Sequence, residues 1–320
     1  MKGARGIAVV FLLAAALALA VSIAGGWQSW SDLRAQAADY PWRLHVGLLA
    51  GALGCATLAL LWTGRVWAVL FRKAGGKETG AGAVAAWLGS NLGRYLPGKV
   101  WQLSGLAAWL RARGDSGAAG FATSLALQAV MLVTGLAVGV VFAGGEAAGA
   151  LGPVPAALLG TGLLAMLHPR VLGGMISLGA RLLREREPSV RPEAGSLARA
   201  GLAALAIWAL YGVGFRLLVH GLAPGVSLGQ AAAVGIFAAA YVAGYVVLVA
   251  PGGLVVREGA LAGLLIAATG IPPGAAAAVA AAARIWTTAA ELVAFGIAAA
   301  LAGARGRPDA ARHAGSAERD

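Results

Sequence analysis

The sequence contains little charge and few acidic residues. Only 12% of its 320 residues are charged, and 13 acidic residues face 25 basic ones. Charged residues make up about a quarter of an ordinary soluble domain, so this composition excludes one. Because 59% of the residues are hydrophobic and the mean hydropathy is +0.78, the excess apolar surface must face lipid. The apolar runs are continuous and do not alternate as β-barrel strands do, which predicts an all-α polytopic membrane protein.

The residues of several common chemistries are also missing. The single cysteine, Cys55, lies in an apolar run and cannot form an intrachain disulfide. The sequence shows no His or Cys cluster at metal-ligand spacing, no Walker motif and no serine nucleophile elbow. We therefore expect no catalytic residue, no metal and no cofactor. The net charge of +12 does not indicate a nucleic-acid partner, because the positive-inside rule accounts for it better.

Apolar segments separated by hydrophilic ones are the main feature that is present. Residues 181–199 form the longest hydrophilic loop, and residues 303–320 form a polar, disordered tail. About six full spans are expected, at residues 7–24, 44–62, 118–143, 153–180, 200–220 and 274–302.

Lysine and arginine are concentrated on one side of these spans. The loop expected after residue 62 carries Arg65, Arg72, Lys73 and Lys77, and the amino terminus, the central loop and the tail are also basic. The opposite side has only Arg34 and Arg43. The positive-inside rule then places both termini, the loop 181–199 and the tail in the cytoplasm.

Two further apolar segments are interrupted near a charge. Residues 91–102 read NLGRYLPGKVWQ, so Arg94 and Lys99 flank a break at Pro97 and Gly98. Proline cannot continue a helix and glycine relaxes the backbone, so the helix should break here.

The second interrupted segment, residues 250–259, reads APGGLVVREG. It breaks at Pro251, Gly252 and Gly253 and then presents Arg257 and Glu258. Broken apolar helices with charges at the break are typical of transporter binding sites.

The charge distribution requires both broken segments to be re-entrant hairpins that do not cross the membrane. The first, residues 81–110, then enters from the cytoplasm and the second, residues 230–268, from outside. A single transmembrane domain, residues 1–302, would contain two halves, 1–143 and 153–302. Because the second half starts from the opposite side, the sequence predicts an inverted repeat.

The motifs GRYLPGKVWQ and APGGLVVREG resemble those of the lysylphosphatidylglycerol synthase transmembrane-region (flippase-type) family. The resemblance covers roughly residues 6–302, although only these two motifs are specific, and Val255 stands where family members often have glycine. It implies a stand-alone lipid translocase of a bacterial cytoplasmic (inner) membrane, without the soluble transferase domain. The implied substrates are aminoacylated phospholipids or polyprenyl-phosphate-linked sugars.

The residues at the breaks suit the recognition of a lipid phosphate. A helix that starts after a break presents amino-terminal N–H groups that attract anions, and Lys99, Arg94 and Arg257 would add positive charge. Arg94 and Lys99 could instead extend to the cytoplasmic headgroups. Asn91 and Gln102 either line the substrate cavity or hydrogen bond between helices. Glu258 completes the expected substrate-binding set.

Two more charges lie in the last expected span. Arg284 and Glu291 are seven residues apart and so lie on one helix face. Each could pair with Arg257 and Glu258. The ion pair would be either structural or part of gating or coupling, with Glu291 as an alternative proton carrier.

Transport is the function that these observations favour. The alternatives are a membrane-embedded enzyme that modifies a lipid, with Glu258 as its general base, and a membrane anchor for a soluble transferase bound at the loop 181–199. The sequence leaves open the identity of the lipid, the energy source and the oligomeric state.

Overall fold

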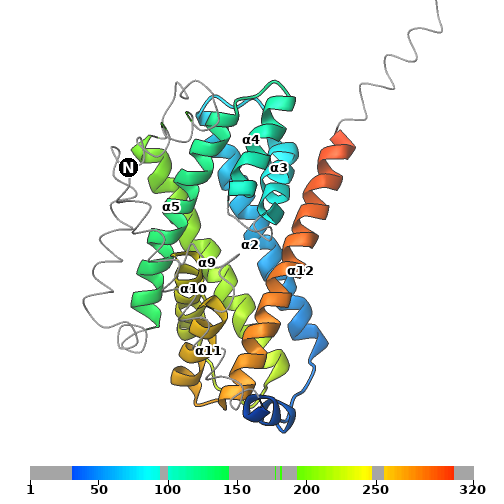
Figure 1. Cartoon of the computed structure of the whole chain (residues 1–320), viewed down its shortest axis with the longest axis vertical. Helices are drawn as coiled ribbons and strands as arrows, with labels where there is room; N and C mark the ends of the chain where they lie inside the picture. The colour runs from blue at the N-terminus through cyan, green and yellow to red at the C-terminus, as the bar shows by residue number, and fades with distance from the viewer. Residues whose placement is uncertain are drawn as a thin grey trace, which may run out of the picture.

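The computed structural model describes residues 31–93, 100–143, 193–246 and 256–305, together with the isolated residues Ser177 and Arg181 (Figure 1). These residues form helices and short connections, and no strand occurs among them. The predicted all-α class is therefore confirmed for this part of the chain. The predicted first span, nearly all of the span 153–180 and most of the loop 181–199 and the tail 303–320 lie outside the described residues.

Four long helices have the length and composition to cross a membrane. At 1.5 Å per residue the shortest, with 26 residues, is about 39 Å long, which exceeds a hydrocarbon core of about 30 Å. They correspond to the second, third, fifth and sixth expected spans, and their length and composition fit a helical membrane protein. The four are α2 (Val46–Lys73), α5 (Gly117–Phe142), α9 (Ala194–Leu222) and α12 (Pro273–Arg305).

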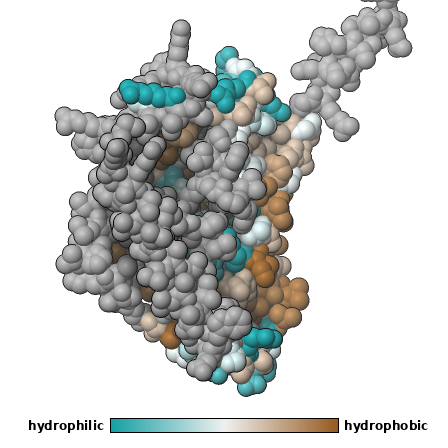
Figure 2. All heavy atoms as spheres, viewed as in Figure 1, coloured by the Kyte–Doolittle hydropathy of each residue, from teal (hydrophilic) through white to brown (hydrophobic). Residues whose placement is uncertain are grey.

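Large apolar side chains point away from the protein on these helices. On α12, Ile285, Leu292 and Leu301 are 71%, 55% and 52% exposed, whereas Ala290, Ala294 and Ala298 on the other face are buried. In Figure 2, hydrophilic residues gather at the two ends of the coloured surface, and apolar ones lie between them on the α12 side. This distribution suits a helix between lipid on one face and protein on the other.

Three expected helix boundaries were wrong, and the largest difference is at the end of α2. The basic loop expected after residue 62 is helical through Lys73, because Trp67, Leu70 and Phe71 continue the buried face of α2. The helix ends only where Gly75 adopts φ 89°, which favours glycine. Arg65, Arg72 and Lys73 therefore lie on α2.

Two of the other long helices also extend into segments expected to be irregular. Helix α9 begins at Ala194, within the predicted loop 181–199, and α12 continues to Arg305, within the predicted tail. Ser196 and Ala200 are buried, so these first turns of α9 contribute to packing.

Each predicted broken segment contains two short helices. The first pair is α3 (Gly80–Leu92) and α4 (Val100–Ala112), and the second is α10 (Gln230–Val246) and α11 (Val256–Thr269). The longest has 17 residues, about 26 Å, which is shorter than the hydrocarbon core. The helices of each pair contact each other. Residues 94–99 and 247–255, which include all five predicted hairpin-break residues, lie outside the described residues.

Hydrogen bonds near both of their ends show that α2 and α9 are antiparallel. At the start of α2, the Arg43 amide donates to the Leu222 carbonyl at 3.1 Å and the His45 amide to the Gly221 carbonyl at 3.0 Å. At the other end, Lys73 Nζ lies 3.0 Å from Ser196 Oγ near the start of α9.

The two ends of the α3–α4 pair are tied together beside the end of α2. Asp115 Oδ2 accepts hydrogen bonds from the amides of Lys77, at 2.9 Å, and Glu78, at 2.8 Å. The α10–α11 pair instead joins the end of α9 to the start of α12. Since α2 and α9 are antiparallel, the two pairs enter the bundle from opposite ends, and Figure 1 shows α3 and α4 towards the top and α10 and α11 towards the bottom. We call the α3–α4 end, which also carries Arg72, Lys73 and Lys77, the basic end.

Helix contacts in one half correspond to those in the other. If α2, α3, α4 and α5 are matched with α9, α10, α11 and α12, each contact maps onto another contact or onto itself. Helix α5 packs on α10 as α12 packs on α3, and α4 packs on α5 as α11 packs on α12. The α2–α9 contact joins the two matched first helices.

Candidate functional site

The contact between α5 and α10 is closed by small residues. A Cβ added to Gly139 on α5 would lie 3.1 Å from the Cβ of Ala239 on α10. A Cβ added to Gly235 would collide with the backbone at Phe142 and Ala143. Glycine and alanine let the two helix backbones approach each other closely.

The equivalent contact between α12 and α3 contains an aromatic residue. Phe295 on α12 faces Gly89 on α3, and a Cβ on Gly89 would lie 3.0 Å from the ring. Counted from the first residue of each helix, Phe295 occupies the position of Gly139, and Gly89 that of Ala239. A phenylalanine ring between two helices holds their axes further apart than glycine does.

A cavity of about 950 Å³ lies along this second contact, between α3, α4 and α12. It reaches the basic end, where the guanidinium of Arg113 lies 3.9 Å from the Trp109 ring and 3.8 Å from the Glu78 carboxylate. The cavity is large enough for a small ligand or a lipid headgroup. Its lining is mostly small residues, among them Gly82, Ala85, Ala86, Gly89, Gly93, Gly105, Ala299, Ala302 and Gly303.

The predicted site residues of the first hairpin are only partly placed. Arg94 and Lys99 lie outside the described residues, and Gln102 is placed only as a residue of α4, without its side chain. Asn91 is 5% exposed on the last turn of α3 and has an interaction partner. The phosphate cradle predicted around Arg94 and Lys99 therefore stays a prediction.

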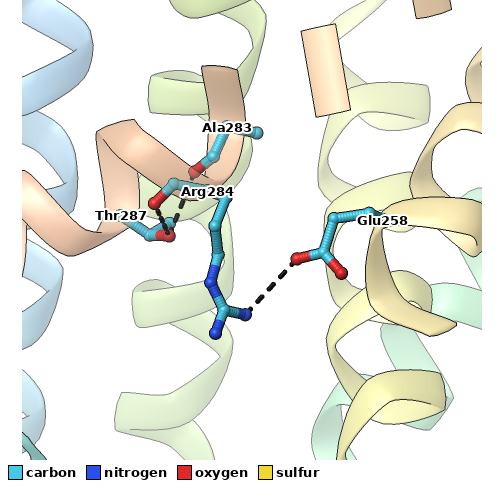
Figure 3. A network of polar contacts seen from close by, with 4 residues as sticks. All are labelled: Glu258, Ala283, Arg284 and Thr287. Atoms are coloured by element: carbon cyan, nitrogen blue, oxygen red, sulfur yellow. Dashed lines mark hydrogen bonds and ion pairs between the residues drawn. The ribbon is translucent and has the colours of Figure 1, made fainter. Parts of the chain in front are cut away.

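In the second hairpin, Glu258 forms an ion pair across a helix contact. Arg284 extends from α12 to Glu258 on α11, with 3.3 Å between Nη1 and Oε1 (Figure 3). The two side chains are 19% and 22% exposed, so protein shields most of the pair from solvent. Oε2 of Glu258 is buried and has no hydrogen-bond partner among the described residues. This is one of the pairings that the sequence allowed.

Arg257, the other charge of this hairpin, lies against aromatic rings of α10. Its guanidinium carbon is 5.2 Å from the centre of the Phe237 ring and 6.0 Å from that of Tyr241, within the range of cation–π attraction. Gly244 makes this approach possible, because a Cβ there would lie 2.6 Å from the Cβ of Arg257. The charge is thus held at the contact between α10 and α11.

An aromatic cluster beside Arg257 was missed by the sequence analysis. Phe237 stacks on Tyr211, with 5.2 Å between the ring centres, and forms a T-shaped contact with Trp286 at 5.6 Å. These contacts join α9, α10 and α12. Helical spacing was the available signal, since α9 carries aromatic residues at 208, 211 and 215 and α10 at 237, 241 and 245.

Glu291, the alternative proton carrier, is 6% exposed two turns beyond Arg284 on α12. It has a polar or charged partner. Arg284 is 19% exposed and Glu291 is buried, so both lie on the protein-facing side of α12, and the ion pair between Arg284 and Glu258 links α12 to α11.

The positions equivalent to this ion pair in the first half carry neutral amides. Counted from the first described residue of each short helix, Gln102 on α4 corresponds to Glu258, and counted from the first residue of each long helix, Gln128 on α5 corresponds to Arg284. Nε2 of Gln128 is buried without a hydrogen-bond partner among the described residues. The ion pair between α11 and α12 thus has amides, not charges, at the corresponding positions of α4 and α5.

Comparisons with protein-family models, with curated proteins and with solved structures gave no match to this chain.

Proposed function

We propose that the protein is a lipid translocase that moves a phospholipid or a polyprenyl-phosphate-linked sugar between membrane leaflets. The observation that carries the proposal is the difference between two equivalent contacts: the α5–α10 contact is closed, and the α3–α12 contact has a cavity that reaches the basic end. Transport needs a site that opens to one side while its counterpart is shut. In this proposal the short helix pairs are re-entrant hairpins of an inverted repeat.

Positive charge inside the bundle supports a phosphate-bearing substrate. A charge costs about 3 kcal/mol or more at the centre of a bilayer, so intramembrane charges usually serve a function. Arg257, held on Phe237 and Tyr241, has a planar guanidinium that binds phosphate in bidentate fashion. The headgroup would enter at the cavity and reach a site between the two hairpins.

The distribution of charge supports an orientation. Arg72, Lys73, Lys77 and Arg113 lie at the basic end, so the positive-inside rule places this end in the cytoplasm. The cavity would then face the cytoplasmic leaflet of a bacterial inner membrane, with both termini on the same side. The resemblance of the two interrupted motifs to the flippase-type family supports the same substrate class.

Transport of fluorescent lipids in proteoliposomes tests the proposal. The full chain is reconstituted with labelled phosphatidylglycerol, its aminoacyl form or a polyprenyl-phosphate sugar, and the fraction accessible to a membrane-impermeant quencher is followed over time. We expect one lipid to move faster with the wild-type protein than in empty vesicles, and Arg257→Gln to lose most of that gain. Arg43→Gln, an exposed cation at the opposite end, is the matched control and should keep it.

Three outcomes would contradict the proposal. Accessibility equal to that of empty vesicles for all three lipids excludes autonomous transport and favours an anchor for a partner transferase. A chemically altered lipid would favour the membrane-embedded enzyme with Glu258 as its base. Equal loss with Arg257→Gln and Arg43→Gln would remove Arg257 from the substrate site.

A further inference from the structure

A second, smaller cavity lies on the contact between α2 and α9, away from both hairpins. It has a volume of about 310 Å³ and lies towards the basic end. Three of its lining residues are cations: Arg65 and Lys73 on α2 and Arg199 on α9. None of its described lining residues is a carboxylate.

These three cations are not neutralised by the described part of the chain. Among the described residues, no acidic group lies within ion-pair distance of any of the three. Lys73 Nζ is instead 3.0 Å from Ser196 Oγ, a neutral hydroxyl that also lines the cavity. Like charges that share a small volume repel one another, and a bound anion relieves that repulsion.

Helix packing alone does not explain the cluster. At the other end of the same α2–α9 contact, a Cβ on Gly221 would lie 2.9 Å from Leu49, and one on Gly51 would lie 3.4 Å from Leu217. That end is closed by apolar side chains and glycine. The two helices therefore pack without cations where the cavity is absent.

The surroundings of the cavity favour a lipid over a soluble anion. Trp62, at the rim, is 42% exposed, and Leu58, one turn further from the basic end, is 52% exposed. Arg65 lies eight residues, about 12 Å, from the end of α2 at Lys73, so the cations cover at least the depth of one headgroup layer. An acyl chain could follow Trp62 and Leu58 while the phosphate contacts the cations.

We propose that this cavity binds the headgroup of an anionic phospholipid from the leaflet at the basic end, as a site separate from the transport path. Arg65 and Arg199 donate to the phosphate from opposite helices, Lys73 adds a third charge, and Ser196 adds a hydroxyl. The lipid joins the two halves of the molecule at the α2–α9 contact, where the first long helix of each half meets that of the other. This site does not depend on transport by the protein.

Native mass spectrometry of the full chain in detergent tests the site. The protein is titrated with phosphatidylglycerol or phosphatidylcholine, and the lipid-bound fraction gives the affinity. Each Lys or Arg near an anionic membrane surface contributes about 1 kcal/mol, so Arg65→Gln and Arg199→Gln should each weaken phosphatidylglycerol binding about fivefold. Phosphatidylcholine should bind more weakly and respond less.

Arg72→Gln is the matched control. Arg72 is exposed next to Lys73 on α2 but does not line the cavity, so its loss should leave the affinity for phosphatidylglycerol unchanged. An equal loss with Arg72→Gln would overturn the site, because the effect would then come from net charge. Equal affinity for phosphatidylcholine, or binding of glycerol phosphate as tight as that of the lipid, would also overturn it.

Transport measured on the same variants separates this site from the proposed function. If Arg65→Gln binds phosphatidylglycerol more weakly but the wild type transports no lipid, the lipid site stands and the translocase proposal is excluded. If the wild type transports lipid but substitution of the cavity cations leaves phosphatidylglycerol binding unchanged, the translocase proposal stands and the lipid site is excluded.

Discussion

The two halves contain matching helices in the same order, yet they differ where each short helix pair meets the last long helix of the other half. Gly139 and Ala239 close the α5–α10 contact, whereas Phe295 and Gly89 meet in the α3–α12 contact beside a cavity of about 950 Å³. A change from glycine to phenylalanine at equivalent positions thus accompanies the change from a closed to an open contact. Side-chain size at a helix crossing sets how closely two helices approach.

The two halves also differ in the charge of the residues where each second short helix meets its long neighbour. Glu258 and Arg284 form an ion pair in the second half, and Gln102 and Gln128 occupy the equivalent positions in the first. Both short helices contact their long neighbours, although only the second half has this pair of opposite charges at the matched positions. In the proposed translocase this pair serves in recognition or gating of a charged headgroup.

The largest effect is expected from a bulky residue in the closed contact. Gly235→Leu places a side chain against the backbone of Phe142 and Ala143, which cannot move aside as a side chain can. Overpacking a tight site costs about 1–3 kcal/mol, and a collision with backbone belongs at or above the upper end of that range. The midpoint of thermal unfolding in detergent should fall steeply.

Gly296→Leu is the control for this change. Gly296 is exposed on α12, and a Cβ there meets nothing within 4 Å. Both variants replace a helical glycine by leucine, so intrinsic helix propensity changes equally. Equal unfolding midpoints for Gly235→Leu and Gly296→Leu would show that the α5–α10 contact is not tight.

Neutralising the ion pair should have the next largest effect. Arg284→Gln or Glu258→Gln alone leaves one charge in a largely shielded place, and hydrogen bonds to charged groups contribute about 1.5–3 kcal/mol. The double variant recreates the amide pair found at the equivalent positions of the first half. We expect the single variants to lose about 2 kcal/mol of unfolding free energy and the double variant to recover most of it.

A double-mutant cycle, with transport measured alongside, checks this prediction. Restored stability together with lost transport would assign the charges to function. Additive losses in the double variant would instead mean that the two side chains do not interact, contrary to the 3.3 Å contact.

The positions of the long helices and of the interrupted segments can be predicted from the sequence, because long apolar runs and proline–glycine breaks are strong signals. Long apolar runs predict where α2, α5, α9 and α12 lie, and most of the predicted helix ends are within two turns of the observed ones. The two proline and glycine breaks mark the segments that contain the short helices. Breaks of this kind act through local backbone geometry, so they can be read from adjacent residues.

Contacts between distant segments could not be predicted in this way. Nothing in the neighbouring sequence distinguishes Phe295 from any other apolar residue of α12. Its role as a spacer follows only from its contact with Gly89 on α3. Charge usually marks the end of a span, so the sequence alone predicts a loop where the basic residues of α2 lie. Arg65 and Lys73 remain helical because the apolar face of α2 continues beneath them, and they then line a cavity with Arg199.

Replacing the aromatic ring tests whether it holds the second contact open. Phe295→Ala recreates the alanine–glycine pair of the closed contact, so α12 should approach α3 and the cavity should shrink. Burial of new surface should keep the loss of unfolding free energy below the roughly 3–5 kcal/mol of a Phe→Ala change that leaves its cavity. A thiol at Ala299→Cys, in a Cys55→Ser background, should then react severalfold more slowly with a soluble maleimide.

An unchanged reaction rate would mean that something other than Phe295 separates the two helices. Ala302→Cys, which also lines the cavity but lies nearer the end of α12, reports whether the whole cavity or only its inner part narrows.

The smallest effect is expected at the outer ends of the first hairpin. Asp115 accepts the amides of Lys77 and Glu78, so Asp115→Ala removes two hydrogen bonds that tie α3 to α4 at the basic end. Each is worth about 1 kcal/mol or less at a partly exposed position, and amide exchange at residues 77 and 78 should accelerate with little change in the unfolding midpoint. If Phe295 alone sets the opening, the Ala299→Cys thiol should react at the same rate with and without Asp115. A faster reaction would show that the cavity also depends on how firmly the hairpin is anchored, and the open contact would then reflect a loose helix pair as well as a large side chain.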